Sequence, residues 1–485
     1  MNKSNLSPSC VFDQFKQINQ IPRPSKHEEK MVEYLKEFAK KHGLDVKVDA
    51  VNNVIIRKPA TPGYENRKVV ILQSHTDMVC DKLVDVEFDF NTDAIQTYVD
   101  GEWMKAKGTT LGADDGIGVA MQLAVLESND IQHGPLECVF TSDEETQMTG
   151  ASGMEPGFMT GDWLINLDSE DEGEIFVSCA GGRSTHAVFH FEKEEAPKDY
   201  FFLQISVKGL TGGHSGDDIN KKRANAIKLL ARFVYLEQEK YDVRLASFNS
   251  GKLHNAIPRD GRVVMAVPND VKENVRADWN VFAHEVADEF YVTDTAMEFA
   301  MESANAEKVM PADVSRRIIM ALQGITNGVF AICQDPALGG MVETSSNIAV
   351  VKTTENTVDL LASQRSNVMS NLTNQCNAVG AVLKLAGAEV EQTDGYPAWQ
   401  MNPNSELTKV AIESYKRLFN KEPIVRGIHA GLECGQFATS YPGMDMVSFG
   451  PTLRDVHTPD ERLLIPTVQM VWDHLLDILK NVPAK

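Results

Sequence analysis

Short apolar runs that end abruptly in acidic or imidazole side chains recur along this chain. The runs and the polar residues that follow them are 68–73 (KVVILQ) before Ser74-His75, 136–141 (LECVFT) before Asp143-Glu144-Glu145, 162–167 (DWLINL) before Asp168, and 445–450 (DMVSFG) before the loop that carries His457. Apolar runs of this length, followed by a polar loop, are typical of buried strands. Ligands of an open α/β sheet collect beyond the carboxyl ends of its strands, so we expect these four strand ends to face one pocket.

Longer segments with apolar residues three and four positions apart predict amphipathic helices. The clearest are residues 27–43, 117–128, 221–240, 366–387, 405–419 and 467–481. Before Gly181-Gly182 helical patterns alternate with short strands, which is typical of a three-layer α/β domain. After it, residues 185–192, 201–209 and 262–268 read as antiparallel strands.

Because His457 lies far from the other polar strand ends in sequence, the domain that holds them must be discontinuous. We therefore predict an α/β fold: a discontinuous three-layer α/β/α domain made of residues 1–182 and 396–485, with an inserted α+β domain at residues 183–395.

The segment SHTD carries two of the candidate residues, His75 and Asp77. In an extended chain side chains two residues apart leave the same face, so Asp77 can hold the second ring nitrogen of His75 and fix its tautomer for metal binding. Asp114 lies in a further candidate segment, LGADDG, where the adjacent Asp115 could exchange roles with it.

The donor types indicate the class of metal. Imidazoles and carboxylates without a CxxC pair suit Zn²⁺, Mn²⁺ or Co²⁺ better than a thiolate zinc site or an all-oxygen calcium site. Asp114, Glu145 and Asp168, together with one hydroxide, balance the four positive charges of two divalent ions. Glu144 is then left over, and a spare carboxylate beside an activated water is what a general base requires.

Composition narrows the class of protein. The 485 residues are 42% hydrophobic and 24% charged, as in ordinary globular proteins, and the length corresponds to more than one domain. A net charge of −22 argues against nucleic acid and anionic membrane partners, which require clustered Lys and Arg. It also means that an anionic substrate needs a local cation such as Arg365.

The cysteines and the amino-terminal segment bear on location. Seven scattered cysteines, an odd number, are typical of reduced thiols in a cytoplasmic protein. The first 24 residues show no apolar signal region, and no apolar stretch reaches the roughly 18 residues of a membrane span. We expect a cytoplasmic protein.

A series of characteristic stretches covers nearly the whole chain in order: SHTDMVCD (74–81), GTTLGADDGIGVA (108–120), DEETQMTGA (143–151), NLDSEDEGE (166–174), SCAGG (178–182), GLTGGHSGDDINKKRANA (209–226), HNAIPR (254–259), SQRSN (363–367), HAGLECGQF (429–437) and SFGPTLRDVHTPDE (448–461). Together these stretches resemble the M20 metallopeptidases and, within them, the bacterial aminoacyl-histidine dipeptidases. The resemblance implies that the discontinuous domain is a zinc-peptidase catalytic domain and that the insert is a lid domain. Gln147 and Lys221-Lys222 depart from the family pattern, which leaves substrate preference and lid motion open.

The resemblance implies a role for each matching residue. Asp114 would bridge two zinc, cobalt or manganese ions, with His75 and Asp168 completing one ion and Glu145 and His457 the other. The catalytic residues would be Asp77, which orients His75; Glu144, the general base; and His214, which stabilises the oxyanion. The residues that would contact the substrate are Asn255, Arg365 and Gly431.

The activity implied is hydrolysis of unblocked dipeptides, including Xaa-His, with β-alanyl-histidine as a candidate substrate and a homodimer as a candidate assembly. Two alternatives remain open at this point. Another amide hydrolase of the same architecture, such as a tripeptidase, aminoacylase or deacetylase, would keep every metal ligand. A non-catalytic peptide-binding protein would not need Glu144 or Asp77.

Overall fold

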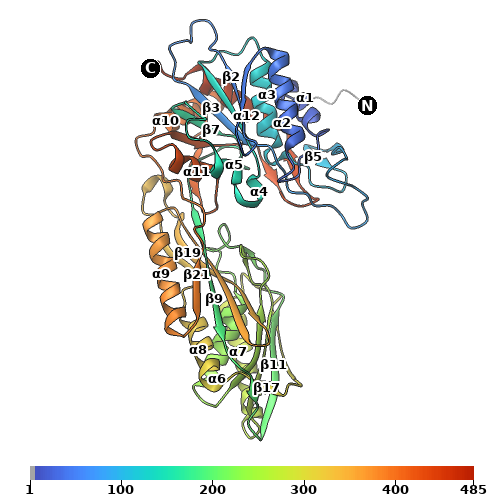
Figure 1. Cartoon of the computed structure of the whole chain (residues 1–485), viewed down its shortest axis with the longest axis vertical. Helices are drawn as coiled ribbons and strands as arrows, with labels where there is room; N and C mark the ends of the chain where they lie inside the picture. The colour runs from blue at the N-terminus through green and yellow to red at the C-terminus, as the bar shows by residue number, and fades with distance from the viewer. Residues whose placement is uncertain (1–5) are drawn as a thin grey trace. The chain divides into compact units, whose positions relative to one another are not determined.

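The computed structural model describes residues 6–485 and divides the chain into two compact units (Figure 1). The first unit contains the chain up to Ser178, Trp399–Gly427 and Leu432–Lys485. The second contains Cys179–Ala398 and the short segment Ile428–Gly431. The chain therefore enters the second unit twice, and the sequence pattern gave no sign of the second entry.

A mixed eight-stranded sheet forms the centre of the first unit. Its strands lie in the order β1 (Asp45–Val48), β2 (Val54–Lys58), β6 (Leu136–Thr141), β3 (Val70–His75), β7 (Trp163–Asn166), β23 (Asp445–Ser448), β8 (Glu174–Cys179) and β22 (Ile424–Ile428), of which the last residues of β8 and β22 already belong to the second unit. The four central neighbours β6, β3, β7 and β23 run parallel. They are the four strands that the apolar runs predict, and being parallel they present their carboxyl ends at one edge of the sheet.

Helices cover both faces of this sheet. The helices of the first unit are α1 (Ser9–Ile18), α2 (Glu29–His42), α3 (Ala113–Glu127), α4 (Glu144–Gln147), α5 (Thr149–Gly153), α10 (Glu406–Phe419), α11 (Glu433–Ser440) and α12 (Ile465–Lys480). Figure 1 shows α1, α2 and α3 on one side of the sheet and α10 on the other. A smaller sheet orders β24 (Leu453–Arg454), β25 (Arg462–Leu464), β5 (Trp103–Ala106) and β4 (Thr97–Asp100).

The second unit contains an antiparallel sheet covered by helices. Its strands follow the order β16 (Glu298–Ser303), β11 (Tyr200–Lys208), β15 (Gly261–Pro268), β13 (Arg244–Ser250), β19 (Val342–Thr353), β20 (Thr357–Ser366), β9 (Gly181–His190) and β21 (Glu389–Gln392), with β18 (Gly328–Ile332) pairing with β19. Two short pairs join β10 (Glu194–Glu195) to β17 (Lys308–Val309) and β12 (Gly213–His214) to β14 (Ala256–Ile257). The helices are α6 (Ala226–Gln238), α7 (Lys272–Glu289), α8 (Ala312–Gly324) and α9 (Met369–Leu385), with a 3₁₀ turn at Pro336–Leu338.

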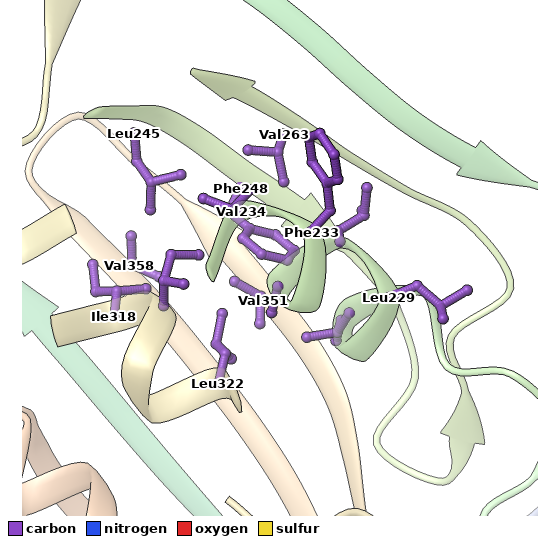
Figure 2. Packing of buried hydrophobic residues seen from close by; sticks show 14 of the residues in the cluster. Leu229, Phe233, Val234, Leu245, Phe248, Val263, Ile318, Leu322, Val351 and Val358 are labelled. Carbon is purple, nitrogen blue, oxygen red and sulfur yellow. The ribbon is translucent and has the colours of Figure 1, made fainter. Parts of the chain in front are cut away.

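An apolar core holds the second unit together. Figure 2 shows side chains of α6 and α8 packed against strand residues, with Phe233 and Phe248 in the cluster. Helix α6 begins later than its apolar pattern predicts, because the side chain of Asn225 caps it by accepting hydrogen bonds from the amides of Ile227 and Lys228. Residues 221–225 are therefore not part of the helix.

The predicted fold class is confirmed: α/β, with a discontinuous first unit and an α+β insert. The role of the insert as a lid stays a prediction. All seven cysteines are free thiols. Among residues 6–485, no helix combines the length and apolar character that a membrane crossing needs.

Candidate metal centre

The polar residues predicted at strand ends come together in the first unit. His75 is the last residue of β3, Glu144 and Glu145 begin α4 just after β6, and Asp168 follows β7 by two residues. Asp114 lies in the first turn of α3, and His457 lies in the loop between β24 and β25. Five segments of the chain, the last of them the loop of His457, thus supply one cluster.

Asp114 lies at the middle of this cluster. Its Oδ1 atom is 3.1 Å from Nε2 of His75, and its Oδ2 atom is 3.1 Å from Nε2 of His457. The same nitrogen of His75 lies 3.4 Å from Oδ1 of Asp168, and that of His457 lies 3.0 Å from Oε2 of Glu145. The two oxygens of one carboxylate therefore face two different imidazoles, each with a further carboxylate beside it.

These separations fit ligands that share metal ions. Two donors held about 2.1 Å from a tetrahedral Zn²⁺ lie roughly 3.4 Å apart. Oε1 of Glu145 is buried and has no hydrogen-bond partner. His75, Asp114 and Glu145 offer ligand atoms that all lie within 4.8 Å of one another. The donor set and the unpaired oxygen both fit divalent cations.

Asp77 supports the cluster from the other side of His75. Its Oδ1 atom is 3.3 Å from Nδ1 of His75. Its carboxylate also accepts hydrogen bonds from the backbone amides of Glu144 (3.0 Å) and Glu145 (3.2 Å) and from the hydroxyl of Ser25 (2.8 Å). One buried carboxylate thus orients an imidazole and fixes the start of α4, as the partners of metal-bound histidines do.

The charges of the cluster perturb one another. Burial lowers the pKa of His75, but the carboxylates of Asp168, Asp114 and Asp77 outweigh it and hold that pKa well above its usual range. Burial also opposes protonation of His457, whose pKa Asp114 and Glu145 nevertheless raise to about 11. Burial raises the pKa of Asp168 to about 7 in spite of His75. Crowded carboxylates with perturbed pKa values are a feature of functional sites, and divalent cations relieve their repulsion.

Glu144 and Glu145 have different surroundings although they are adjacent. Glu145 faces His457, whereas no contact ties the Glu144 carboxylate to either imidazole. Burial, followed by the charges of Asp168 and Glu145, raises the pKa of Glu144 well above its usual value against the opposing effect of His75. A carboxylate with a raised pKa beside the ligands is suited to carry a proton.

The structure distinguishes Asp114 from its neighbour Asp115. Whereas both oxygens of Asp114 contact imidazoles, Asp115 accepts a hydrogen bond from the amide of Gly118 at 3.2 Å. Residues 170–172, expected to form a solvated loop, are half-buried, and the carbonyl oxygen of Glu170 accepts hydrogen bonds from the amide of Leu453 and the guanidinium of Arg454. Burial and the charges of Asp114 and Asp168 raise the pKa of Glu170 to about 8.

The second unit holds a separate cluster around Arg365, the last but one residue of β20. One terminal nitrogen of Arg365 donates to the hydroxyl of Tyr396 at 2.6 Å, and the other lies 3.3 Å from Nε2 of His214. Nδ1 of His214 accepts from the amides of Gly216 (3.3 Å) and Asp217 (3.2 Å), so the hydrogen of the neutral ring lies on Nε2.

A terminal nitrogen of Arg365 and Nε2 of His214 are therefore two hydrogen-bond donors that face each other. An anion that accepts a hydrogen bond from each would satisfy both. Arg365 is 8% exposed, and its Nε atom has no hydrogen-bond partner. His429, in the segment Ile428–Gly431, bonds to the Ser345 hydroxyl at 2.7 Å. Burial and the charge of Arg365 lower its pKa to about 3, so it is neutral.

Asn255 and Gly431 also belong to the second unit. The carbonyl oxygen of Asn255 accepts a hydrogen bond from the amide of Ser215 at 2.8 Å, which fixes the segment next to His214. Gly431 ends the segment Ile428–Gly431. Tyr396, His429, Arg23 and Glu461 were not predicted as site residues, because their contacts join segments distant in sequence and follow no local pattern.

Comparisons with known proteins agree with this geometry. The model of Peptidase family M20/M25/M40 matches residues 71–481. The chain is 44% identical over 483 residues to the "Cytosol non-specific dipeptidase" of Escherichia coli (strain K12), covering 99% of both chains. A crystal structure of an aminoacylhistidine dipeptidase from Vibrio alginolyticus is 43% identical, with a TM-score of 0.90 over 99% of this chain and 98% of that one.

A more distant structure shows the fold alone. The aminopeptidase PepT from Bacillus cereus is 16% identical, with a TM-score of 0.58 over 98% of each chain. The match of the family model across most of the chain and the 44% identity over nearly its full length decide the assignment. This chain belongs to Peptidase family M20/M25/M40.

Proposed function

We propose that this chain is a dipeptidase that depends on two divalent metal ions, with zinc as the expected metal and cobalt or manganese as substitutes. The observation that carries the proposal is the position of Asp114. Its two oxygens face His75 and His457, and each of these imidazoles has a second carboxylate beside it. Such a symmetric arrangement suits a pair of ions that share one bridging carboxylate.

In this proposal His75, Asp114 and Asp168 would hold one ion, and Asp114, Glu145 and His457 would hold the other. When bound, the ions supply a Lewis acid for the scissile carbonyl and lower the pKa of water. Glu144 takes a proton from the water that attacks the carbonyl carbon and delivers it to the amine that leaves as the C–N bond breaks. Its raised pKa suits a group that must both accept and return a proton.

We assign substrate recognition to the donors of the second unit. Arg365 would bind the dipeptide carboxylate, for which its two terminal nitrogens provide a fork. His214 would donate from Nε2 to the oxygen that becomes negative in the transition state. Asn255 and Gly431 would contact the substrate backbone. The names of the two relatives that match over nearly the whole chain support a dipeptide substrate.

The name of the Escherichia coli relative, with the seven free thiols, supports a location in the cytoplasm. The homodimer stays a prediction. The substrate class, by contrast, can be tested directly on the purified protein.

The test removes metal from the purified full chain and follows cleavage of three substrate sets. These are dipeptides including β-alanyl-histidine, tripeptides, and N-acyl amino acids, each with Zn²⁺, Mn²⁺ or Co²⁺ restored. We expect dipeptide cleavage that requires restored metal. Cleavage of tripeptides or acyl amino acids alone would contradict the substrate assignment, and no cleavage by a metal-loaded protein would contradict the enzyme assignment.

A further inference from the structure

Two buried charged side chains of the first unit, Arg23 and Glu461, join the segments that carry the candidate ligands. Each is 2% exposed. Arg23 lies between two prolines in the connection from α1 to α2, and Glu461 follows His457 by four residues. Charged groups are costly to bury, so their contacts need a structural reason.

Arg23 ties the end of β3 to the start of α3. One terminal nitrogen of its guanidinium donates to the carbonyl oxygens of Thr76 and Asp77, both at 3.1 Å. The other donates to the carbonyl oxygen of Gly112 at 2.6 Å. A planar guanidinium can serve these oxygens at once because its donors diverge in a fixed fork.

Two glycines make room for this guanidinium. A Cβ atom on Gly112 would lie 2.5 Å from a terminal nitrogen of Arg23, and one on Gly116 would lie 2.7 Å from the same atom. Gly112 also has a φ angle of +65°, which favours glycine. The backbone on both sides of Asp114 is therefore built around Arg23.

Glu461 ties the same turn of α3 to the loop of His457. Its Oε2 atom accepts from the amides of Leu111 (2.7 Å) and Gly112 (3.0 Å), and its Oε1 atom accepts from that of Ala113 (2.8 Å). The amide of Asp114 lies 3.4 Å from Oε1. These are the unpaired donors at the start of a helix, where a carboxylate is electrostatically favoured.

The loop of His457 needs such support. His457 has a φ angle of +64° and Asp455 one of +54°, in the left-handed region that residues other than glycine seldom adopt. The amide of Gly112 donates to Glu461, and its carbonyl oxygen accepts from Arg23. This one residue therefore connects the two buried charged side chains.

We propose that Arg23 and Glu461 are positioning residues that set the spacing of the ligands across the metal pair. Arg23 fixes His75 relative to Asp114, and Glu461 fixes His457 relative to Asp114. Neither is one of the residues that we propose to hold the metal ions or to contact the substrate. The inference rests on the metal centre of the proposed function and concerns how tightly that centre binds its ions.

The decisive variant is Glu461→Gln, which keeps the shape but replaces an accepting oxygen with an NH₂ group facing backbone amides. The matched control is Glu137→Gln. Glu137 is also 2% exposed, and it accepts from the amides of Thr160 (2.7 Å) and Gly161 (3.0 Å) at the opposite end of β6 from the ligands.

Zn²⁺ affinity is measured on the full-length proteins by competition with a chelator, and bound zinc is counted after dialysis. We expect Glu461→Gln to lose about tenfold or more in affinity for at least one ion, the range found for residues that orient metal ligands. Glu137→Gln should keep its zinc affinity even though its thermal midpoint falls. Equal losses of affinity in both variants, or none in Glu461→Gln, would overturn the proposal.

Arg23→Lys keeps the inference testable if Glu461→Gln does not fold. A single ammonium group cannot reach both Gly112 and the carbonyls after β3, so zinc affinity should fall and kcat should fall more than KM changes. Wild-type zinc affinity in Arg23→Lys would contradict the role. If the wild-type protein binds zinc but cleaves no dipeptide, the proposed function fails while the affinities still decide this inference.

Discussion

Each of the two units contains a polar cluster, and the two clusters have opposite electrostatic character. Around Asp114 in the first unit, carboxylates raise the pKa of His457 to about 11. Around Arg365 in the second, burial and a fixed positive charge lower the pKa of His429 to about 3. An imidazole is thus stabilised in its charged form in the first unit, at His457, and in its neutral form in the second, at His429.

This difference in charge suits the two clusters to different ligands. Excess carboxylates with raised pKa values attract cations and hold them through imidazole and oxygen ligands. The second cluster contains a guanidinium and two imidazoles beside the single carboxylate of Asp217, a balance that favours an anion. In a chain with a net charge of −22, Arg365 would then be the local cation that we propose for an anionic substrate. Changes in either cluster should therefore have effects of different kinds.

The largest effect is expected for Glu144→Gln in the first unit. Because this change removes the proposed base but none of the proposed ligands, kcat should fall by about 10²–10⁴-fold while bound zinc stays at the wild-type amount. Activity assays and metal analysis of the same preparation check this. Glu145→Gln, by contrast, should lose zinc and activity together.

Glu155→Gln provides the surface control, since Glu155 is half exposed and pairs with Lys47. It should change neither zinc content nor kcat. If Glu144→Gln and Glu145→Gln lost zinc to the same extent, the division of roles between these neighbours would be wrong.

Arg365→Lys in the second unit should weaken substrate use and leave the metal centre unchanged. A lysine keeps the charge but loses the fork and its contact with Tyr396, so kcat/KM should fall by about 10–100-fold, the value of one or two charged hydrogen bonds. Kinetics with dipeptides and with their C-terminal amides measure the effect. An equal loss of kcat/KM on both kinds of substrate would show that Arg365 does not bind the substrate carboxylate. The control is Arg262→Lys, on the exposed side of β15.

Protonation of His429 tests the electrostatics of the second cluster directly. Its pKa is about 3 in the folded protein and about 6.5 when unfolded, so the unfolded state binds more protons between these values. The resulting stability is present above pH 6.5 and is lost as pH falls toward 3.

Between pH 7 and pH 5 the stability lost through protonation of His429 in the unfolded state amounts to about 2 kcal/mol of unfolding free energy. Urea unfolding of metal-free wild type and His429→Gln at both pH values measures it. The variant should lose less stability than the wild type on acidification. Parallel losses in the two proteins would show that His429 is not held neutral by its surroundings.

Sequence patterns could predict the first cluster better than the second for a physical reason. His75 and Asp168 lie at or just beyond the ends of parallel strands, and strand burial leaves a local apolar signal. Arg23 and Glu461 contact backbone atoms of distant segments, so no spacing identifies them. Likewise His429 reaches the second unit only because four residues of a later segment cross into it.

The smallest expected effect is that of Tyr396→Phe, which removes the 2.6 Å hydrogen bond from Arg365. Loss of the Arg365 contact should cost about 1 kcal/mol, or roughly fivefold in kcat/KM, because the guanidinium keeps its charge and its fork. If Tyr396 acts by holding Arg365, the double variant Tyr396→Phe, Arg365→Lys should be no worse than Arg365→Lys alone, since the lysine has already lost that contact. Additive losses would mean that Tyr396 acts independently of Arg365, and the second cluster would then offer two separate donors to the anion in place of one supported guanidinium.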